Sequence, residues 1–251
     1  MLLSEQDLDH FRHNGWLLTK PFSADRVNEI RHWVDEVQSW PDDGDWLHYR
    51  ERTDHGPRLC RTENFVPFHA SLRELLTAGP IIDIATALLG EPAVLYKEKI
   101  NYKLAGGAGY SPHQDAPAYR FVETHISCMI AVDDSVLENG CLEVVSARHQ
   151  QLLEMNDRGC ITDELVQQMT WVPVELKAGD ALWFHSLTPH RSGANTSSVD
   201  RRAMYPTFNA LREGDLRGAY YEQKLREFRE APSSGETVQV SLISDFEGKP
   251  V

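Results

Sequence analysis

The sequence has few cysteines, no long apolar run and no excess of positive charge. Its four cysteines lack the close C-x-x-C spacing of a zinc or redox motif, so we expect reduced thiols that act as small hydrophobic side chains. They are Cys60, Cys128, Cys141 and Cys160. No stretch of about 18 apolar residues indicates a transmembrane helix, and the acidic, polar opening is not typical of a signal peptide. These absences favour a cytoplasmic protein.

Acidic residues outnumber basic ones by 38 to 25, which gives a formal net charge of −13. An acidic surface repels nucleic acid and anionic membranes, so we expect neither as a partner. A small-molecule substrate fits better, because a local cluster of basic side chains can still bind an anion. The length of 251 residues permits one domain with a sizeable core. The oligomeric state is left open.

The chain changes its pattern near residue 93. Before it, apolar residues at helical spacing predict helices, with serine at two of the starts and glycine at two of the ends. These helices cover 4–15, 23–40, 70–76 and 81–90. Residues 41–68 are polar, aromatic and irregular, which predicts a long surface loop and a candidate lid over an active site.

After residue 93, short alternating segments separated by Gly, Pro, Asn and Asp predict strands. They cover 93–104, 125–134, 141–147, 171–176, 180–187 and 202–208, with a weak last strand at 238–243. Residues 216–231 return to a helical pattern. We therefore expect a single domain over 1–251 with a sandwich or jelly-roll core. Its parts are a mainly helical cover (1–92), a β core (93–212) and a C-terminal helix and tail (213–251).

The segment "GGAGYSPHQDAPAY" places His113 and Asp115 one residue apart in a stretch that reads as extended. Side chains two apart on a strand project to the same side, so the pair could share one metal ion. Either His185 or His190, further along the chain, could supply a third ligand. Two histidines and one carboxylate leave coordination positions open, as in non-haem Fe(II) oxygenases.

Arg201 follows His190 by eleven residues and could return beside the metal, where a guanidinium suits a dicarboxylic cosubstrate. Two other interpretations remain open. A cupin-like hydrolase or isomerase could use the same ligands with Zn²⁺ or Mn²⁺ and would not need Arg201. A non-catalytic binding module could hold a structural metal if His185 supplied a fourth ligand.

The order of these motifs resembles the phytanoyl-CoA dioxygenase family. The H-x-D pair is followed by "ENGCLEVVSARH" (138–149), "LKAGDALWFHSLTPHRSGANTS" (176–197) and an arginine, and "SEQDLDHFRHNGWLLTKPFS" (4–23) resembles the family's start. The resemblance implies a double-stranded β-helix (jelly roll, cupin-like) and a dioxygenase that uses Fe(II), 2-oxoglutarate and O2. It implies that His113, Asp115 and His190 bind the metal, and that Arg201 binds 2-oxoglutarate. Because Asp115 is present, it implies hydroxylation.

The segment "YKEKINYKLAGGAGY" (96–110) concerns the substrate. By parity, one face of this strand carries three lysines and one asparagine: Lys97, Lys99, Asn101 and Lys103. These side chains either line a pocket for an anion such as a phosphonate or form the solvated face of an edge strand.

The segment around the metal pair also resembles the family branch that hydroxylates 2-aminoethylphosphonate, or its N-methylated form, at the carbon bearing phosphorus. On this resemblance Tyr102, Arg58 and Arg61 are candidate substrate-binding residues, and Asn101 is a candidate contact for 2-oxoglutarate. The same oxygenase chemistry on another small polar substrate is the alternative.

Overall fold

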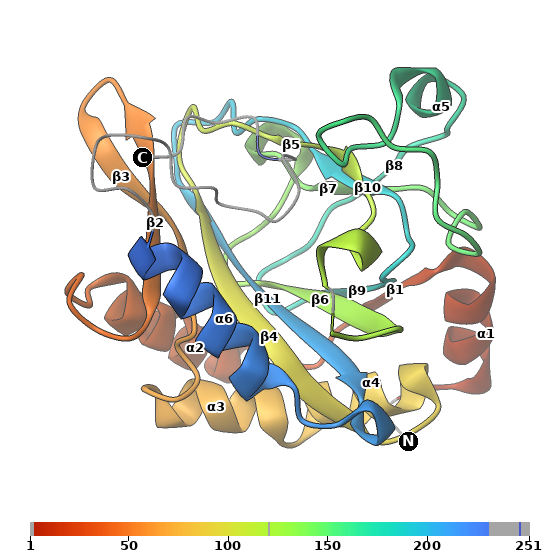
Figure 1. Cartoon of the computed structure of the whole chain (residues 1–251), viewed down its shortest axis with the longest axis horizontal. Coiled ribbons are helices and arrows are strands. Elements are labelled where there is room, and N and C mark those ends of the chain that lie inside the picture. The colour runs from red at the N-terminus through yellow and green to blue at the C-terminus, as the bar shows by residue number, and fades with distance from the viewer. Residues whose placement is uncertain (1–2, 120, 231–245, 247–251) are drawn as a thin grey trace.

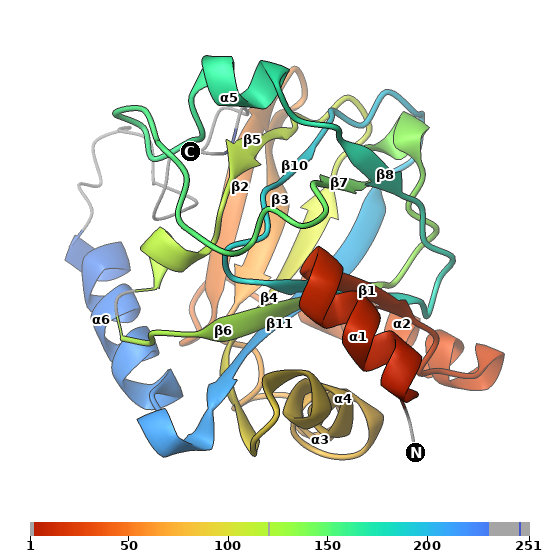
Figure 2. The same cartoon turned by 90° about the vertical axis from the view of Figure 1, so that its right-hand side faces the viewer.

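Two antiparallel sheets form the centre of the computed structural model, which describes residues 3–119, 121–230 and 246 (Figures 1 and 2). The seven-stranded sheet has the order β1 (Trp16–Thr19), β9 (Ala181–His185), β6 (His125–Ala131), β11 (Arg201–Ala210), β4 (Ala93–Lys103), β3 (Gly56–Glu63) and β2 (Leu47–Thr53). The four-stranded sheet has the order β5 (Tyr110–His113), β10 (His190–Ser192), β7 (Leu142–Val144) and β8 (Val172–Val174). This is the expected double-stranded β-helix.

Four helices from the N-terminal part of the chain cover the outer face of the large sheet (Figures 1 and 2). They are α1 (Glu5–Asn14), α2 (Ala24–Gln38), α3 (Ala70–Thr77) and α4 (Pro80–Leu89). Ser4 forms a capping box with Asp7 at the start of α1, and Ser23 caps α2. Gly15 ends α1 and Gly90 ends α4, each in the left-handed conformation that glycine adopts readily. The four predicted helices are therefore confirmed.

Strand β6 shows how the large sheet separates two cores. Ile126, Cys128 and Ile130 pack with the helices, whereas Met129 and Ala131 pack between the two sheets. Side chains alternate along a strand, so a strand buried on both faces reads as a continuous apolar run. The cavity described below lies on the second of these faces, between the sheets.

The prediction of a surface loop over 41–68 is wrong for most of this range. Residues 47–63 instead form the hairpin β2–β3, which pairs with β4 and extends the large sheet. Several of its buried side chains are charged, among them Glu51, Arg61 and Glu63. Charged residues at inward positions hide the apolar alternation by which a strand is recognised. The short strand β1, which pairs with β9, also lacked such a signal.

The helix α6 (Arg217–Glu230) confirms the prediction for 216–231 and packs beside β4 (Figure 1). Tyr220 and Tyr221 join a core cluster with Tyr49, Tyr96 and Tyr119. A short helix, α5 (Asp163–Gln167), lies between β7 and β8 in the sequence. The predicted strand at 238–243 lies outside the described residues. Within the described part of the chain, no helix has the length and apolar character needed to cross a membrane.

Candidate active site

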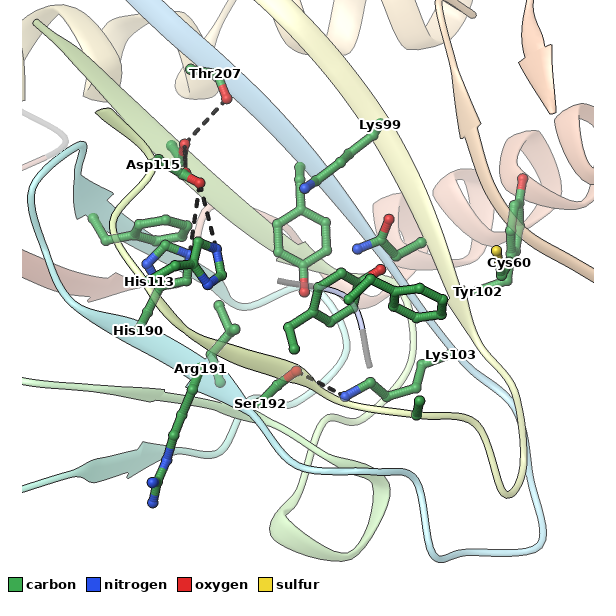
Figure 3. A pocket seen from close by; sticks show the side chains of 18 of the residues that line it. Cys60, Lys99, Tyr102, Lys103, His113, Asp115, His190, Arg191, Ser192 and Thr207 are labelled. Atoms are coloured by element: carbon green, nitrogen blue, oxygen red, sulfur yellow. Dashed lines mark hydrogen bonds and ion pairs between the residues drawn. The ribbon is translucent and has the colours of Figure 1, made fainter. Parts of the chain in front are cut away.

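His113, Asp115 and His190 converge at one end of the space between the sheets (Figure 3). One ligand atom from each residue lies within 4.8 Å of the others, and no other such group occurs in the ranges that the structure describes. His113 ends β5 and His190 begins β10, and the two are direct partners across these strands. Of the two candidate histidines, His190 thus lies with the pair, while His185 is outside this group.

The prediction that His113 and Asp115 share one face of a strand is wrong. Strand β5 ends at His113, and Asp115 lies beyond it with helical backbone angles of −71° and −26°, at the start of a short 3-10 helix (Ala116–Ala118). The carboxylate therefore reaches the imidazoles through this change of chain direction and not through strand alternation. One Asp115 oxygen, Oδ1, lies 3.8 Å from Nε2 of each histidine.

Both imidazoles are oriented by backbone carbonyls. Nδ1 of His113 lies 2.7 Å from the carbonyl oxygen of Ser111, and Nδ1 of His190 lies 3.0 Å from that of Thr188. A carbonyl oxygen only accepts hydrogen bonds, so each Nδ1 carries the proton. Each Nε2 is left with a lone pair directed at the same point, which is the arrangement that metal-binding histidines require.

The carboxylate of Asp115 is held in a similar way. Its second oxygen, Oδ2, accepts a hydrogen bond of 2.9 Å from Ser127 Oγ on β6, and that hydroxyl lies 3.2 Å from Thr207 Oγ1 on β11 (Figure 3). This leaves Oδ1 for a metal ion. Ser127 gave no sequence signal, because a polar residue within an apolar strand has no distinctive spacing.

The charge states also suit a divalent cation. Burial and the neighbouring His113 lower the pKa of His190 to about 4, so its imidazole is neutral at pH 7. Burial alone would raise the pKa of Asp115, but the neighbouring His190, His113, Lys99 and Lys97 lower it well below its usual value. A neutral imidazole and an ionised carboxylate are the forms that bind metal.

A cavity opens beside these three residues and encloses about 720 Å³ of empty space, counting its open mouth. One wall is formed by alternate residues of β4, namely Lys97, Lys99, Asn101 and Lys103. Strand β4 lies between β11 and β3, so the alternative of a solvated edge strand is wrong. The Lys97 ammonium lies 4.3 Å from the ring centre of Tyr119, and that of Lys99 lies 5.2 Å from the ring centre of Tyr205.

Lys103 is engaged differently from the other two lysines. Its ammonium donates to Ser192 Oγ at 2.9 Å and to the carbonyl oxygens of Gly140 and Gly193, so it joins β4 to the turn after β10 (Figure 3). Arg191 points away from the cavity in the same view and pairs with Glu143. Among the lysines of β4 that line the cavity, Lys97 and Lys99 are therefore the two that act on the metal-binding group, since both lower the pKa of Asp115.

Arg201 begins β11 opposite Lys103 and lines the same cavity with 2% of its surface exposed. Its Nη2 donates to the Gly140 carbonyl oxygen at 2.7 Å. Its Nε is buried and has no hydrogen-bond partner among the residues that the structure describes. A buried cationic donor without an acceptor is costly, which indicates a site for an anionic group. The residues present therefore fit Fe(II) together with 2-oxoglutarate.

The other predicted residues have different positions. Asn101 lines the cavity. Tyr102 also lines the cavity, but its ring packs in the core beneath the helices, and its hydroxyl lies 3.2 Å from Thr62 Oγ1. Arg61 is buried behind Asn101, to which its Nε donates at 3.1 Å. Arg58 is exposed and pairs with Asp200 at 2.7 Å.

A double-stranded β-helix that brings two histidines and one carboxylate together beside a cationic cavity is the architecture of a non-haem metal oxygenase. The comparisons with known proteins agree. The family model "Phytanoyl-CoA dioxygenase (PhyH)" matches residues 11–203. The chain belongs to this family and is a dioxygenase, as the sequence motifs implied.

Two curated relatives match almost the whole chain. It is 47% identical to a methylphosphonate hydroxylase of Gimesia maris, over 99% of this chain and 97% of that one. It is 37% identical to a 2-aminoethylphosphonate dioxygenase of an uncultured bacterium, over 97% and 95%. Among solved structures, EctD from S. alaskensis shares the fold with a TM-score of 0.74 at 19% identity, over 84% of this chain and 77% of that one.

Proposed function

We propose that the protein is an Fe(II)- and 2-oxoglutarate-dependent hydroxylase of a small organophosphonate. The observation that carries the proposal is the wall of β4, where Lys97, Lys99 and Asn101 face one cavity together with His113, Asp115 and His190. The substrate would be 2-aminoethylphosphonate, its N-methylated form or a related alkylphosphonate, hydroxylated at the carbon bearing phosphorus. The names of the two full-length relatives refer to such substrates and support this choice.

The lysine pair is the chemical reason for an anionic substrate. Burial and the neighbouring Lys99 lower the pKa of Lys97 well below its ordinary value, although Glu63 and Asp115 oppose this. The buried Lys97 and the half-buried Lys99 repel each other when both are protonated, and a phosphonate between them would relieve this repulsion and favour both protonated forms. Ammonium groups also donate charge-assisted hydrogen bonds to phosphonate oxygens.

Each part of the site has a role in this reaction. When bound, Fe(II) with 2-oxoglutarate and O2 supplies the oxidising chemistry that replaces a C–H hydrogen by hydroxyl. His113, Asp115 and His190 hold the metal through Nε2, Oδ1 and Nε2, and Ser127 keeps the Asp115 carboxylate in place. Arg201 would hold the distal carboxylate of 2-oxoglutarate through Nε, which has no hydrogen-bond partner among the described residues. The wall of β4 holds the phosphonate group and so directs its neighbouring carbon toward the metal.

The test is succinate formation from 2-oxoglutarate by Fe(II)-loaded protein in air. We expect strong stimulation by 2-aminoethylphosphonate, its trimethylammonium analogue or methylphosphonate, and none by a phytanoyl-type thioester. Slow turnover that no phosphonate stimulates would support the oxygenase reaction but refute the proposed substrate. An absence of succinate from iron-loaded protein would refute the reaction class and favour the cupin-like hydrolase.

We also propose that the chain acts as one oxygenase domain in the cytoplasm, without nucleic acid or membrane partners. All four cysteines are buried and free of disulfides, which agrees with a reducing compartment. The net charge of −13 argues against polyanionic partners. Fractionation of cells that express a tagged protein would test the location.

A further inference from the structure

A buried row of alternating charges connects helix α6 to the cavity wall. Lys224 of α6 donates to Glu63 Oε2 at 2.7 Å, and the other oxygen of Glu63 lies 3.5 Å from Arg61 Nη1. Arg61 Nε in turn donates to Asn101 Oδ1 at 3.1 Å. Glu63 is fully buried, and Arg61 has 2% of its surface exposed. None of these three charged residues lines the cavity beside the metal-binding group.

The strand register sets the last contact of this row. Arg61 of β3 and Asn101 of β4 are direct partners in the antiparallel pair, so their side chains project to the same side. Arg61 also donates from Nη2 to the hydroxyl of Tyr110 at 3.1 Å, which fixes the plane of the guanidinium. Glu63 is ionised, because Lys224, Arg61 and Lys97 lower its pKa to about 2 against the opposing effect of burial.

The contact determines which end of the Asn101 amide faces the cavity. An asparagine can present either a carbonyl oxygen or an NH2 group, and a guanidinium N–H can only donate. The atom beside Arg61 must therefore be Oδ1, and Nδ2 lies on the other side of Cγ. No acceptor for Nδ2 is found among the described residues, and Asn101 lines the cavity between Lys99 and Lys103.

We propose that Arg61, supported by Glu63 and Lys224, is a positioning residue that makes Asn101 a hydrogen-bond donor to an oxyanion bound in the cavity. The inference rests on the proposed function for the identity of that oxyanion, which is the phosphonate of the substrate. A carboxylate of 2-oxoglutarate has the same acceptor chemistry and is the other possible source. Without Arg61 the amide could rotate and present its oxygen, which would repel either anion.

The first test is Asn101→Asp, which keeps an oxygen for Arg61 but replaces the Nδ2 donor by a second acceptor. We expect at least about a tenfold rise in both the KM and the calorimetric Kd of the phosphonate, with the 2-oxoglutarate KM within about twofold. The calorimetry is done without O2, so that it reports binding alone. Asn156→Asp is the matched control, because exposed Asn156 uses its Oδ1 to accept from the backbone of Arg158 and Cys160.

The second test is a cycle of Arg61→Met and Asn101→Ala. If Arg61 acts through Asn101, Arg61→Met raises the phosphonate Kd about tenfold in the wild-type background and has no further effect beside Asn101→Ala. A merely structural role would give the same loss in both backgrounds and would overturn the inference. If Arg61→Met does not fold, as its thermal unfolding would show, Asn101→Asp alone decides whether Asn101 acts as a donor.

The outcomes separate this inference from the proposed function. A rise in the 2-oxoglutarate KM instead of the phosphonate KM would keep the donor role of Asn101 and assign the oxyanion to the cosubstrate. If the binding of neither anion depends on Asn101, the inference is overturned even if phosphonates stimulate turnover. If no phosphonate stimulates the wild-type protein, the proposed substrate fails, and the cycle is then measured on 2-oxoglutarate.

Discussion

Arg201 gives the sharpest test of the cosubstrate site. In Arg201→Lys the positive charge remains, but the Nε donor is lost. This nitrogen is buried and unpaired among the described residues, so it is the atom that we expect to bind the distal carboxylate of 2-oxoglutarate. A hydrogen bond between charged groups contributes about 1.5–3 kcal/mol. Its loss should therefore raise the KM for 2-oxoglutarate about 10- to 150-fold.

The adjacent Arg202 provides the matched control. It projects to the opposite face of β11, where its guanidinium pairs with Asp133 and Asp35 on the outside of the sheet. Arg202→Lys should leave the KM for 2-oxoglutarate within about twofold, since its interactions are partly exposed and contribute little. Both variants are measured by succinate formation at varied 2-oxoglutarate and saturating Fe(II). Equal KM values for the two variants and the wild type would refute the role of Arg201 in binding 2-oxoglutarate.

Two further predictions concern the support of the site. Gly140→Ala should lower the thermal unfolding temperature and raise the KM for 2-oxoglutarate, because Gly140 has a positive φ of 72° and its carbonyl holds Arg201. Gly106→Ala, at a φ of 74° with open space around it, should show only the smaller backbone effect, so equal losses would contradict the reasoning. The pKa of Glu63 is lowered from 4.5 to about 2 in the folded protein. The ionised Glu63 should therefore stabilise the folded protein fully above pH 4.5, and this stabilisation should be lost as the pH falls toward 2. Between pH 7 and pH 3 this lowers the free energy of unfolding by about 2 kcal/mol. Glu63→Gln also removes the ion pair with Lys224, and its urea unfolding should lack this part of the pH dependence.

The site was predictable from the sequence where function is tied to local motifs. His113 and Asp115 stand two apart, and the later histidine and arginine follow in the order that the family shares. The parity of Lys97 and Lys99 along one strand placed both on one face, as found. The spacing along β4 survives without tertiary information, because alternate residues on a strand have fixed relative directions. Asp115, by contrast, reaches the imidazoles through a change of chain direction.

Other features depended on contacts between distant segments. The sequence pattern predicts a loop where the hairpin β2–β3 lies, because its inward side chains Arg61 and Glu63 are charged. Glu63 is stabilised there by Lys224, which comes from a helix about 160 residues away. The sequence could not indicate which face of β4 meets the metal group, or that Lys103 is engaged with the turn after β10 while Lys97 and Lys99 face the cavity.

The sequence by itself determined the helices, most strands of the β core and the set of residues that converge on the metal site. The tertiary structure decided how these residues are held: which nitrogen of each imidazole faces the metal site, which oxygen of Asp115 faces it, and which end of the Asn101 amide faces the cavity. The physical reason is that a hydrogen bond fixes the orientation of a side chain only when both partners are in place. The partner of Asp115 lies on β6, and the partner of Asn101 lies on β3.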